Sequence, residues 1–126
     1  LVSASAASSQ SFFEEARLAR TKARDEAMDS LQKSLKKASL TEQEKTDLTA
    51  RLTQEVDAIT QESDVEALIK AKGFVDCVAY VSESKVNITV MTSGDRLTAD
   101  EVTQIRDIVL SKCNVTAQNI TVVEVK

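Results

Sequence analysis

The residue composition of this chain changes at Gly73, and that change limits what each part can fold into. Residues 11–72 are rich in Ala, Leu, Glu, Lys and Gln, which favour helices. Residues 74–126 are rich in Val, Ile and Thr, which favour strands. No proline interrupts either part of the 126-residue chain. The sequence therefore predicts an α+β protein in which a helical region precedes the strands.

The helical region predicts two helices that pack side by side as an antiparallel hairpin joined near Ser39. The first helix is expected over residues 11–38 and begins at Ser11, with a narrow buried stripe. That stripe is expected to contain Ala16, Ala19, Ala23, Ala27, Leu31, Leu35 and Ala38. Ser39 and Glu42 have the spacing of a capping box, which predicts that the second helix begins there.

A break in the second helix is expected near Ser63. Ser63 and Glu66 repeat the capping-box spacing at the point where the apolar positions change phase. The pattern predicts a separate short helix over residues 64–72, which Gly73 would end as a left-handed residue.

After Gly73, the apolar residues alternate with a period of two and predict a β-hairpin. Its strands are expected over residues 75–81 and 86–91. Thr98 and Glu101 have capping-box spacing and predict a helix that continues to about residue 112. A third strand is expected over residues 120–125.

The order α-β-β-α-β predicts a three-stranded sheet with both helices on one face. The first strand is apolar on both faces, as a central strand would be, so the sequence predicts the strand order 3-1-2. We expect three regions: a linker or tag remnant over 1–10, a helical region over 11–62 and the α-β-β-α-β domain over 63–126.

The sequence contains no histidine, which excludes Ser-His-Asp and Cys-His catalytic systems. Cys77 and Cys113 do not have the spacing of a metal site. They are interpreted as buried apolar side chains, with a disulfide or a reactive thiol as the alternatives. No catalytic residue, metal ligand or cofactor-binding residue is predicted. The sequence favours a binding or structural protein.

The formal net charge of −4 argues against nucleic-acid binding, which uses clustered positive charge. No apolar run approaches the roughly 20 residues that span a membrane. Because the sequence begins at Leu1 without a methionine, we expect it to be part of a longer chain.

The second face of the predicted sheet carries apolar residues and is the candidate interaction surface. The N-terminal helices or the linker would cover this face, or a partner protein would bind it. The strands over 85–92 and 119–126 are expected to have open edges that another chain could extend. The candidate contact residues are Tyr80, Val86, Asn87, Ile88, Thr89, Val90, Met91, Arg96, Arg106, Val123 and Val125.

Three segments resemble the extracytoplasmic domain of the stage III sporulation protein AH family. They are EEARLARTKARDEAMDSL at 14–31, VEALIKAKGFVDCVAYVSESKVNITV at 65–90 and NITVVEVK at 119–126. The resemblance implies that the α-β-β-α-β unit is a ring-building motif, similar to those of type III secretion and flagellar ring proteins. It also implies that the protein has no enzymatic activity.

The resemblance implies a location and partners as well. A transmembrane helix outside this sequence would anchor the protein in the mother-cell membrane, with this domain in the intermembrane space around the forespore. There it would bind stage II sporulation protein Q in a channel between the two cells, help hold the engulfing membrane, and assemble into a homo-oligomeric ring. The alternative is a secretion-like ring module that self-assembles without that partner.

Overall fold

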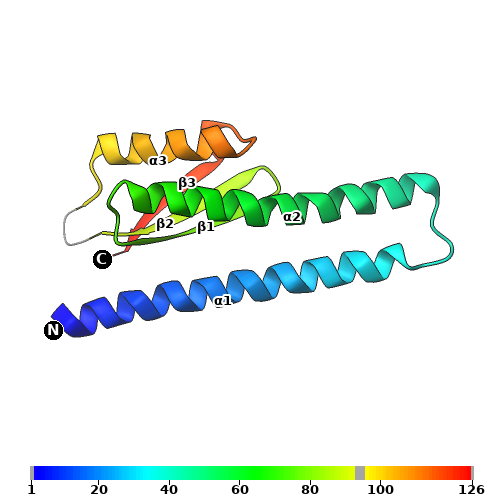
Figure 1. Cartoon of the computed structure of the whole chain (residues 1–126), viewed down its shortest axis with the longest axis horizontal. Helices are drawn as coiled ribbons and strands as arrows, with labels where there is room; N and C mark the ends of the chain where they lie inside the picture. Colours follow the sequence, from blue (N-terminus) through cyan, green and yellow to red (C-terminus); the bar gives the residue numbers. More distant parts are fainter. Residues whose placement is uncertain (1, 93–95, 126) are drawn as a thin grey trace.

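The computed structural model describes residues 2–92 and 96–125, and Figure 1 shows two long antiparallel helices with a small sheet packed against one end of them. The elements are α1 (Val2–Leu35), α2 (Glu42–Ala71), β1 (Asp76–Ser82), β2 (Lys85–Met91), α3 (Ala99–Lys112), a 3-10 turn (Ala117–Asn119) and β3 (Ile120–Val125). The α+β class and the predicted helical hairpin are confirmed.

Helix α1 differs from the prediction in where it begins and in the face that it buries. It begins at Val2, so Ser11 lies inside the helix and does not cap it. Ala19 and Ala23, which were expected in the buried stripe, are exposed. Phe13 and Arg24 are buried instead, because α1 packs against a sheet edge that presents backbone polar groups as well as apolar side chains.

Helix α2 is continuous, and the predicted break near Ser63 is wrong. The capping box that begins the helix consists of Thr41 and Glu44. The apolar positions change phase along α2 because its neighbour changes. One side of the helix faces α1, through ion pairs at Glu55, Glu62 and Glu66, whereas Val65 and Ile69 face the sheet and α3.

The ends of α2 and α3 follow the sequence signals. Gly73 has a φ of +106°, and its N–H donates to the carbonyl of Lys70, as predicted for a residue that follows a helix. Thr98 and Glu101 form the predicted capping box of α3. Glu83 and Ser84 both have positive φ in the turn between β1 and β2, the backbone that a tight hairpin turn requires.

The sheet has the order β1-β2-β3, with β1 antiparallel to β2 and β2 parallel to β3. The predicted order 3-1-2 is wrong, and so is the prediction that residues 85–92 form an outer strand, because β2 is central. Strand β1 is apolar on both faces for another reason. Its inner face packs on α2 and α3, while Val78 on its other face is covered by Phe13 of α1.

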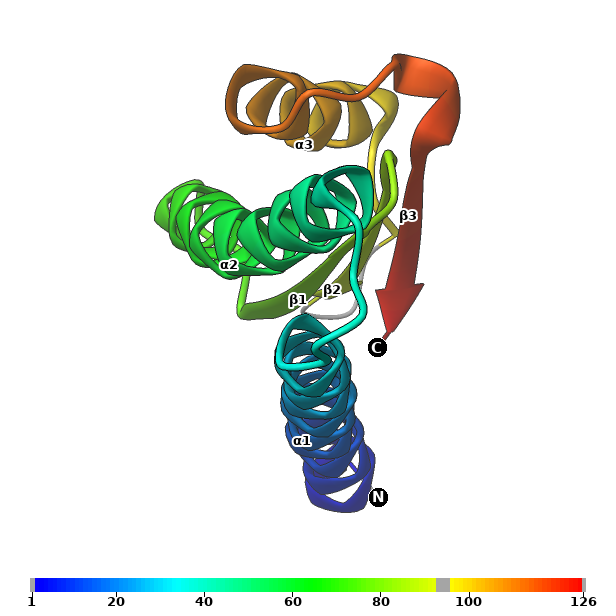
Figure 2. The ribbon, with the colours of Figure 1, turned by 90° about the vertical axis from the view of Figure 1, so that its right-hand side faces the viewer.

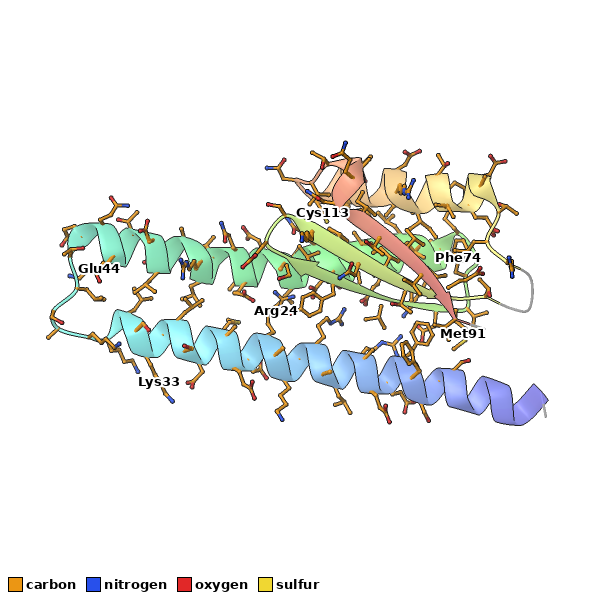
Figure 3. The ribbon with its side chains drawn as sticks, turned by 180° about the vertical axis from the view of Figure 1, so that it is seen from behind. Arg24, Lys33, Glu44, Phe74, Met91 and Cys113 are labelled. Carbon is orange, nitrogen blue, oxygen red and sulfur yellow. The ribbon has the colours of Figure 1, made fainter. Side chains whose placement is uncertain are left out.

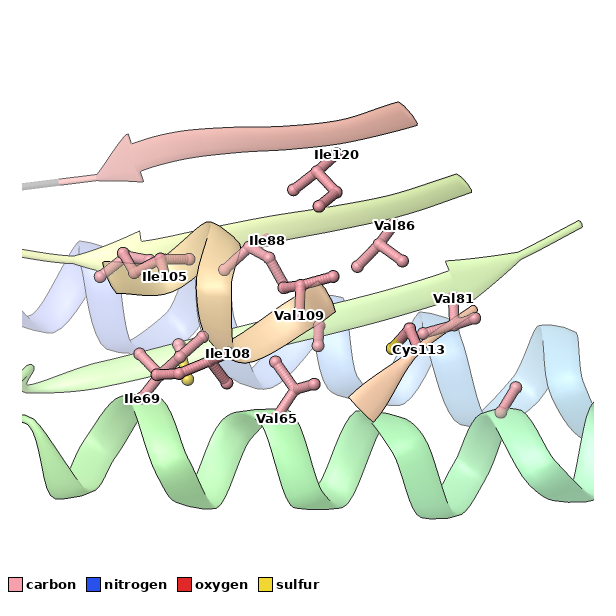
Figure 4. Close-up of a cluster of buried hydrophobic side chains, with 14 residues drawn as sticks. Val65, Ile69, Val81, Val86, Ile88, Ile105, Ile108, Val109, Cys113 and Ile120 are labelled. Carbon is pink, nitrogen blue, oxygen red and sulfur yellow. The ribbon is translucent and has the colours of Figure 1, made fainter. Parts of the chain in front are cut away.

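The main core lies between the sheet and the two helices α2 and α3, which cover one of its faces (Figures 2 and 4). Its buried members are Ala58, Val65, Ile69, Cys77, Ala79, Val81, Val86, Ile88, Val90, Ile105, Ile108, Val109, Cys113 and Ile120. A smaller cluster on the opposite face holds Phe13, Val78 and Met91. Helix α1 therefore covers one end of the second face and leaves the remainder uncovered.

Candidate interaction surfaces

Strand β1 lies at one edge of the sheet, and its outward backbone groups bond to side chains of α1 and α2. The N–H of Ala79 donates to Glu66 Oε2 over 2.8 Å. The carbonyl of the same residue accepts from Arg20 Nη1 over 2.7 Å. Arg20 and Glu66 also form an ion pair with each other. The two side chains together satisfy the groups that a neighbouring strand would otherwise bond.

The same arrangement repeats two residues further along β1. The N–H of Val81 donates to Glu62 Oε2 over 2.8 Å, and Arg24 Nη2 lies 3.5 Å from the carbonyl oxygen of Val81. Arg24 and Glu62 form an ion pair in which both side chains are buried, with exposures of 6% and 4%. Figure 3 shows Arg24 pointing from α1 toward the sheet.

The repeat works because helix and strand spacings nearly match. Four residues of an α-helix rise about 6 Å, and two residues of a strand rise about 6.6 Å. Arg20 and Arg24 are four residues apart on α1, as are Glu62 and Glu66 on α2. Each residue pair therefore meets one outward-facing position of β1.

A third ion pair lies at the start of β1. Asp76 Oδ1 accepts from the N–H of Cys77 over 2.8 Å and from Arg17, and Lys70 lies 3.5 Å away. We call the six residues of the three ion pairs the arginine–carboxylate ladder. They are Arg17, Arg20, Arg24, Glu62, Glu66 and Asp76.

Burial and hydrogen bonding have opposing effects on the charges of the ladder. The pKa of Glu62 is raised overall because burial disfavours its charged form. The hydrogen bond from the N–H of Val81 and the charge of Arg24 lower that pKa, but by less than burial raises it. Burial lowers the pKa of Arg24, but hydrogen bonds and charges from Glu55 and Glu62 outweigh it and raise that pKa overall. Burial likewise raises the pKa of Asp76, but the hydrogen bond from Arg17 and the other nearby donors bring it below its ordinary value.

The uncovered part of the second sheet face is the candidate partner surface, and we call it the open face. Register places Val78, Thr89 and Val123 in one row across the sheet, with the row of Tyr80, Asn87 and Thr121 beside it. Val78 is buried under α1, whereas Val123 is 49% exposed. Tyr80 is partly covered as well, because the guanidinium carbon of Arg24 lies 5.5 Å from the centre of its ring. The open face consists of Asn87, Thr89, Thr121 and Val123.

The structure separates the predicted contact residues into three groups. Tyr80, Asn87, Thr89, Val123 and Val125 lie on the second face of the sheet. The side chains of Val86, Ile88 and Val90 are fully buried in the main core, and Met91 is buried beside Phe13. Arg96 is exposed before α3 and Arg106 is exposed on α3, away from the open face.

Strand β3 forms the other edge of the sheet, as predicted for residues 119–126 in the part that the structure describes. No hydrogen bond joins its outer side to any residue within 2–92 or 96–125. The two edges of one small sheet therefore differ, since side chains occupy one and leave the other open.

Cys77 and Cys113 are both free and buried, which rules out the alternative of a disulfide between them. Burial raises the pKa of Cys77 to about 12, and it also raises the pKa of Cys113. A thiol with so high a pKa is protonated at neutral pH and a poor nucleophile.

The arginine–carboxylate ladder was not predicted from the sequence. Its signal was present: Arg17, Arg20 and Arg24 lie at i, i+3 and i+7 on one face of a helix. On α2, Glu62 and Glu66 lie four residues apart beside the buried Val65. These spacings place the arginines on one side of α1 and the two glutamates on one side of α2.

Comparison with known protein families gives one decisive match. A family model described as SpoIIIAH-like protein matches residues 1–122. The chain belongs to the SpoIIIAH-like family. A sequence search of curated proteins gives no match.

Two solved structures resemble this SpoIIIAH-like chain. A chain in the structure of the SpoIIQ–SpoIIIAH pore-forming complex has a TM-score of 0.74 and 24% identity, covering 90% of this chain and 97% of that one. The type III secretion protein EscJ of enteropathogenic E. coli has a TM-score of 0.52 and 25% identity, covering 59% of this chain. The match spans about half of EscJ (49%). The fold is therefore of the ring-building-motif type.

Neither a membrane span nor a metal site is found among the described residues. None of the helices within 2–92 and 96–125 is long and apolar enough to cross a bilayer. The same residues include no group of three Cys, Asp or Glu side chains placed to hold a metal ion.

Proposed function

We propose that this chain is a non-enzymatic assembly domain that binds SpoIIQ. The observation that carries the proposal is the match over nearly the full length of both chains to a component of the SpoIIQ–SpoIIIAH pore-forming complex. Membership of the SpoIIIAH-like family supports it. The buried, protonated thiols and the absence of histidine also favour binding over catalysis.

The binding surface is the open face together with the adjoining side of α1. Exposed Val123 supplies apolar area beside the hydrogen-bonding side chains of Asn87, Thr89 and Thr121. The mixture of an apolar centre and a polar surround is typical of protein interfaces that form from separately soluble partners. The arginine–carboxylate ladder holds α1 beside this face. The open face and the adjoining side of α1 therefore keep a fixed position relative to each other and can contact one partner together.

The proposed location is inferred from membership of the SpoIIIAH-like family. The domain lies in the intermembrane space between mother cell and forespore, and a transmembrane helix outside this sequence holds it at the mother-cell membrane. In this position it joins SpoIIQ across the space in a sporulation channel, and further copies complete a ring.

Sedimentation velocity of this chain mixed with the extracytoplasmic domain of SpoIIQ tests the proposal. A faster-moving complex that contains both proteins is expected. Thr89→Lys on the open face should weaken the complex at least tenfold, because it places an uncompensated charge in the interface. Gln104→Lys, at an exposed position on α3, is the matched control. If no complex forms at high protein concentration, the proposal is wrong.

A second candidate is a ring module that assembles without SpoIIQ. The resemblance to EscJ over 59% of the chain favours it. Closed oligomers of this chain alone, observed by electron microscopy or native mass spectrometry with no SpoIIQ present, would support this candidate. Assemblies that appear only after SpoIIQ is added would exclude it.

A further inference from the structure

Helix α1 contributes no side chain to the main core among the residues that the structure describes. The members of that core lie on α2, on the three strands, on α3 and directly after α3. Figure 4 shows these side chains between α2, α3 and the sheet. The sheet and the two helices that cover its first face therefore form a core that is complete without α1.

The attachment of α1 to the sheet is small in apolar area and rich in charge. Among the α1 residues whose side chains the structure describes, Ser9, Phe13 and Arg24 are buried. Phe13 packs in the small cluster with Val78 and Met91. The arginine–carboxylate ladder supplies the polar contacts between α1 and β1. Figure 2 shows α1 on the opposite side of the sheet from α3.

Buried ion pairs add little net stability to such an attachment, because both partners lose their hydration when they pair. If α1 moves away from the sheet, both partners of each pair return to water together. Arg24 gains in addition, because its Nε is buried without a hydrogen-bond partner while α1 is docked. Water satisfies this donor once α1 has left. Release of α1 should therefore require less free energy than unfolding of the main core.

We propose that α1 is a releasable strap, which detaches from the sheet as a unit while α2, the strands and α3 stay folded. The docked helix is the ground state, and the released state is a minor one. Release frees the carbonyls of Ala79 and Val81, which accept from arginines of the ladder while α1 is docked. It also uncovers Val78. Helix α1 therefore controls whether the edge of β1 is accessible.

The way in which the two helices share the edge of β1 permits this motion. The N–H of Ala79 donates to Glu66 and the N–H of Val81 donates to Glu62. Both glutamates belong to α2, which remains packed on the sheet through the main core. These hydrogen bonds therefore persist after α1 has left, and they keep β1 in place beside β2.

Thiol labelling of Val78→Cys tests the proposal. Phe13 covers this position while α1 is docked, so a bulky thiol reagent should reach the introduced thiol only after release. Cys77 is the internal control, because it is fully buried in the main core and reacts when that core opens. Each rate is divided by the rate in the urea-unfolded chain, which removes differences in intrinsic reactivity. The introduced thiol should then react at least tenfold faster than Cys77.

Further substitutions in the same variant distinguish release from other motions. Arg24→Ala weakens docking and should speed labelling of the introduced thiol at least tenfold, whereas Lys22→Ala, at an exposed position of α1, should not. Ile105→Val weakens the main core and should speed labelling of Cys77 about fivefold without changing that of the introduced thiol. Equal rates for the two thiols, equal acceleration of both by Ile105→Val, or no acceleration by Arg24→Ala would overturn the proposal.

Hydrogen exchange followed by mass spectrometry gives a second measurement that needs no new cysteine. Backbone amides of α1 over residues 13–24 should exchange at least tenfold faster than those of β2, because a helix depends for most of its stability on the surface that it packs against. Ile105→Val should speed exchange in β2 and leave α1 unchanged. Equal protection of α1 and β2 would overturn the proposal. Because SpoIIQ is absent from both experiments, their outcome is separate from that of the proposed function.

Discussion

The two edge strands of this three-stranded sheet, β1 and β3, differ in how their outward backbone groups are hydrogen-bonded. A strand edge exposes backbone N–H and C=O groups that must find partners in water, in side chains or in another strand. At β1, Arg20 and Arg24 donate to strand carbonyls, while Glu62 and Glu66 accept from strand N–H groups. At β3, no described side chain takes that role.

The difference shows how a pair of helices can substitute for a strand. The ion pairs Arg20–Glu66 and Arg24–Glu62 each place one donor and one acceptor against a single residue of β1. Because the charges are buried, the arrangement specifies the position of α1 as well as closing the edge. The β1 edge is therefore closed by side chains of the chain itself, whereas the outward backbone groups of β3 have no partner among the described residues.

Removing Arg24 should have the largest effect on the β1 side. Arg24→Ala leaves the buried Glu62 without its principal ion-pair partner. The free energy of unfolding should fall by about 3–5 kcal/mol, as for other broken buried pairs. Urea denaturation followed by circular dichroism measures it. Lys22→Ala, at an exposed position of α1, should change it by less than about 0.5 kcal/mol. Equal losses in the two variants would show that the ladder does not hold the edge.

Phe13 tests the apolar part of the attachment of α1. It is fully buried against Val78 and Met91, so Phe13→Ala should lower the free energy of unfolding by about 3 kcal/mol. Phe12→Ala is the matched control because Phe12 is 48% exposed, and its loss should stay below about 1 kcal/mol. Chemical denaturation measures the free energy of unfolding of both variants. A similar cost for Phe12→Ala would mean that α1 packs in another rotation.

The pair of Arg17 and Asp76 makes part of the β1 attachment dependent on pH. Because the pKa of Asp76 is below its ordinary value in the folded state, its contribution is present at neutral pH and is lost as pH falls through the folded pKa. Asp76→Asn should cost about 1 kcal/mol at pH 7, and the difference from wild type should shrink below about pH 4. Denaturation midpoints across this pH range provide the measurement. A difference that does not vary with pH would exclude the ion pair as its source.

A charge placed on β3 should have the smallest effect on folding. Val123→Lys lies at a half-exposed position with no ion-pair partner to disturb, so the free energy of unfolding should change by less than about 0.5 kcal/mol. Thermal unfolding of the variant and of the wild-type chain provides the measurement. A loss comparable to that of Arg24→Ala would mean that the β3 edge is held within the monomer after all.

Local signals predicted most of the elements correctly. The capping box of Thr98 and Glu101, the helix-ending Gly73 and the two-residue alternation in the strands each depend on neighbours in the sequence. The predictions that failed depend on distant neighbours. The phase change near Ser63 reflects a change of packing partner along one continuous helix. Of the candidate contact residues, the alternation placed Val86, Ile88 and Val90 on one face together but could not show that this face is the core.

The sequence by itself determined that the chain forms helices before Gly73 and a β-β-α-β unit after it, because helix and strand propensities and caps act over a few residues. Only the tertiary structure decided the strand order and the difference between the two edges. Arg20 and Ala79 are 59 residues apart, and their contact exists only because α1 folds back along α2 to reach β1. The edge that the ladder closes and the edge that stays open are consequences of that long-range packing.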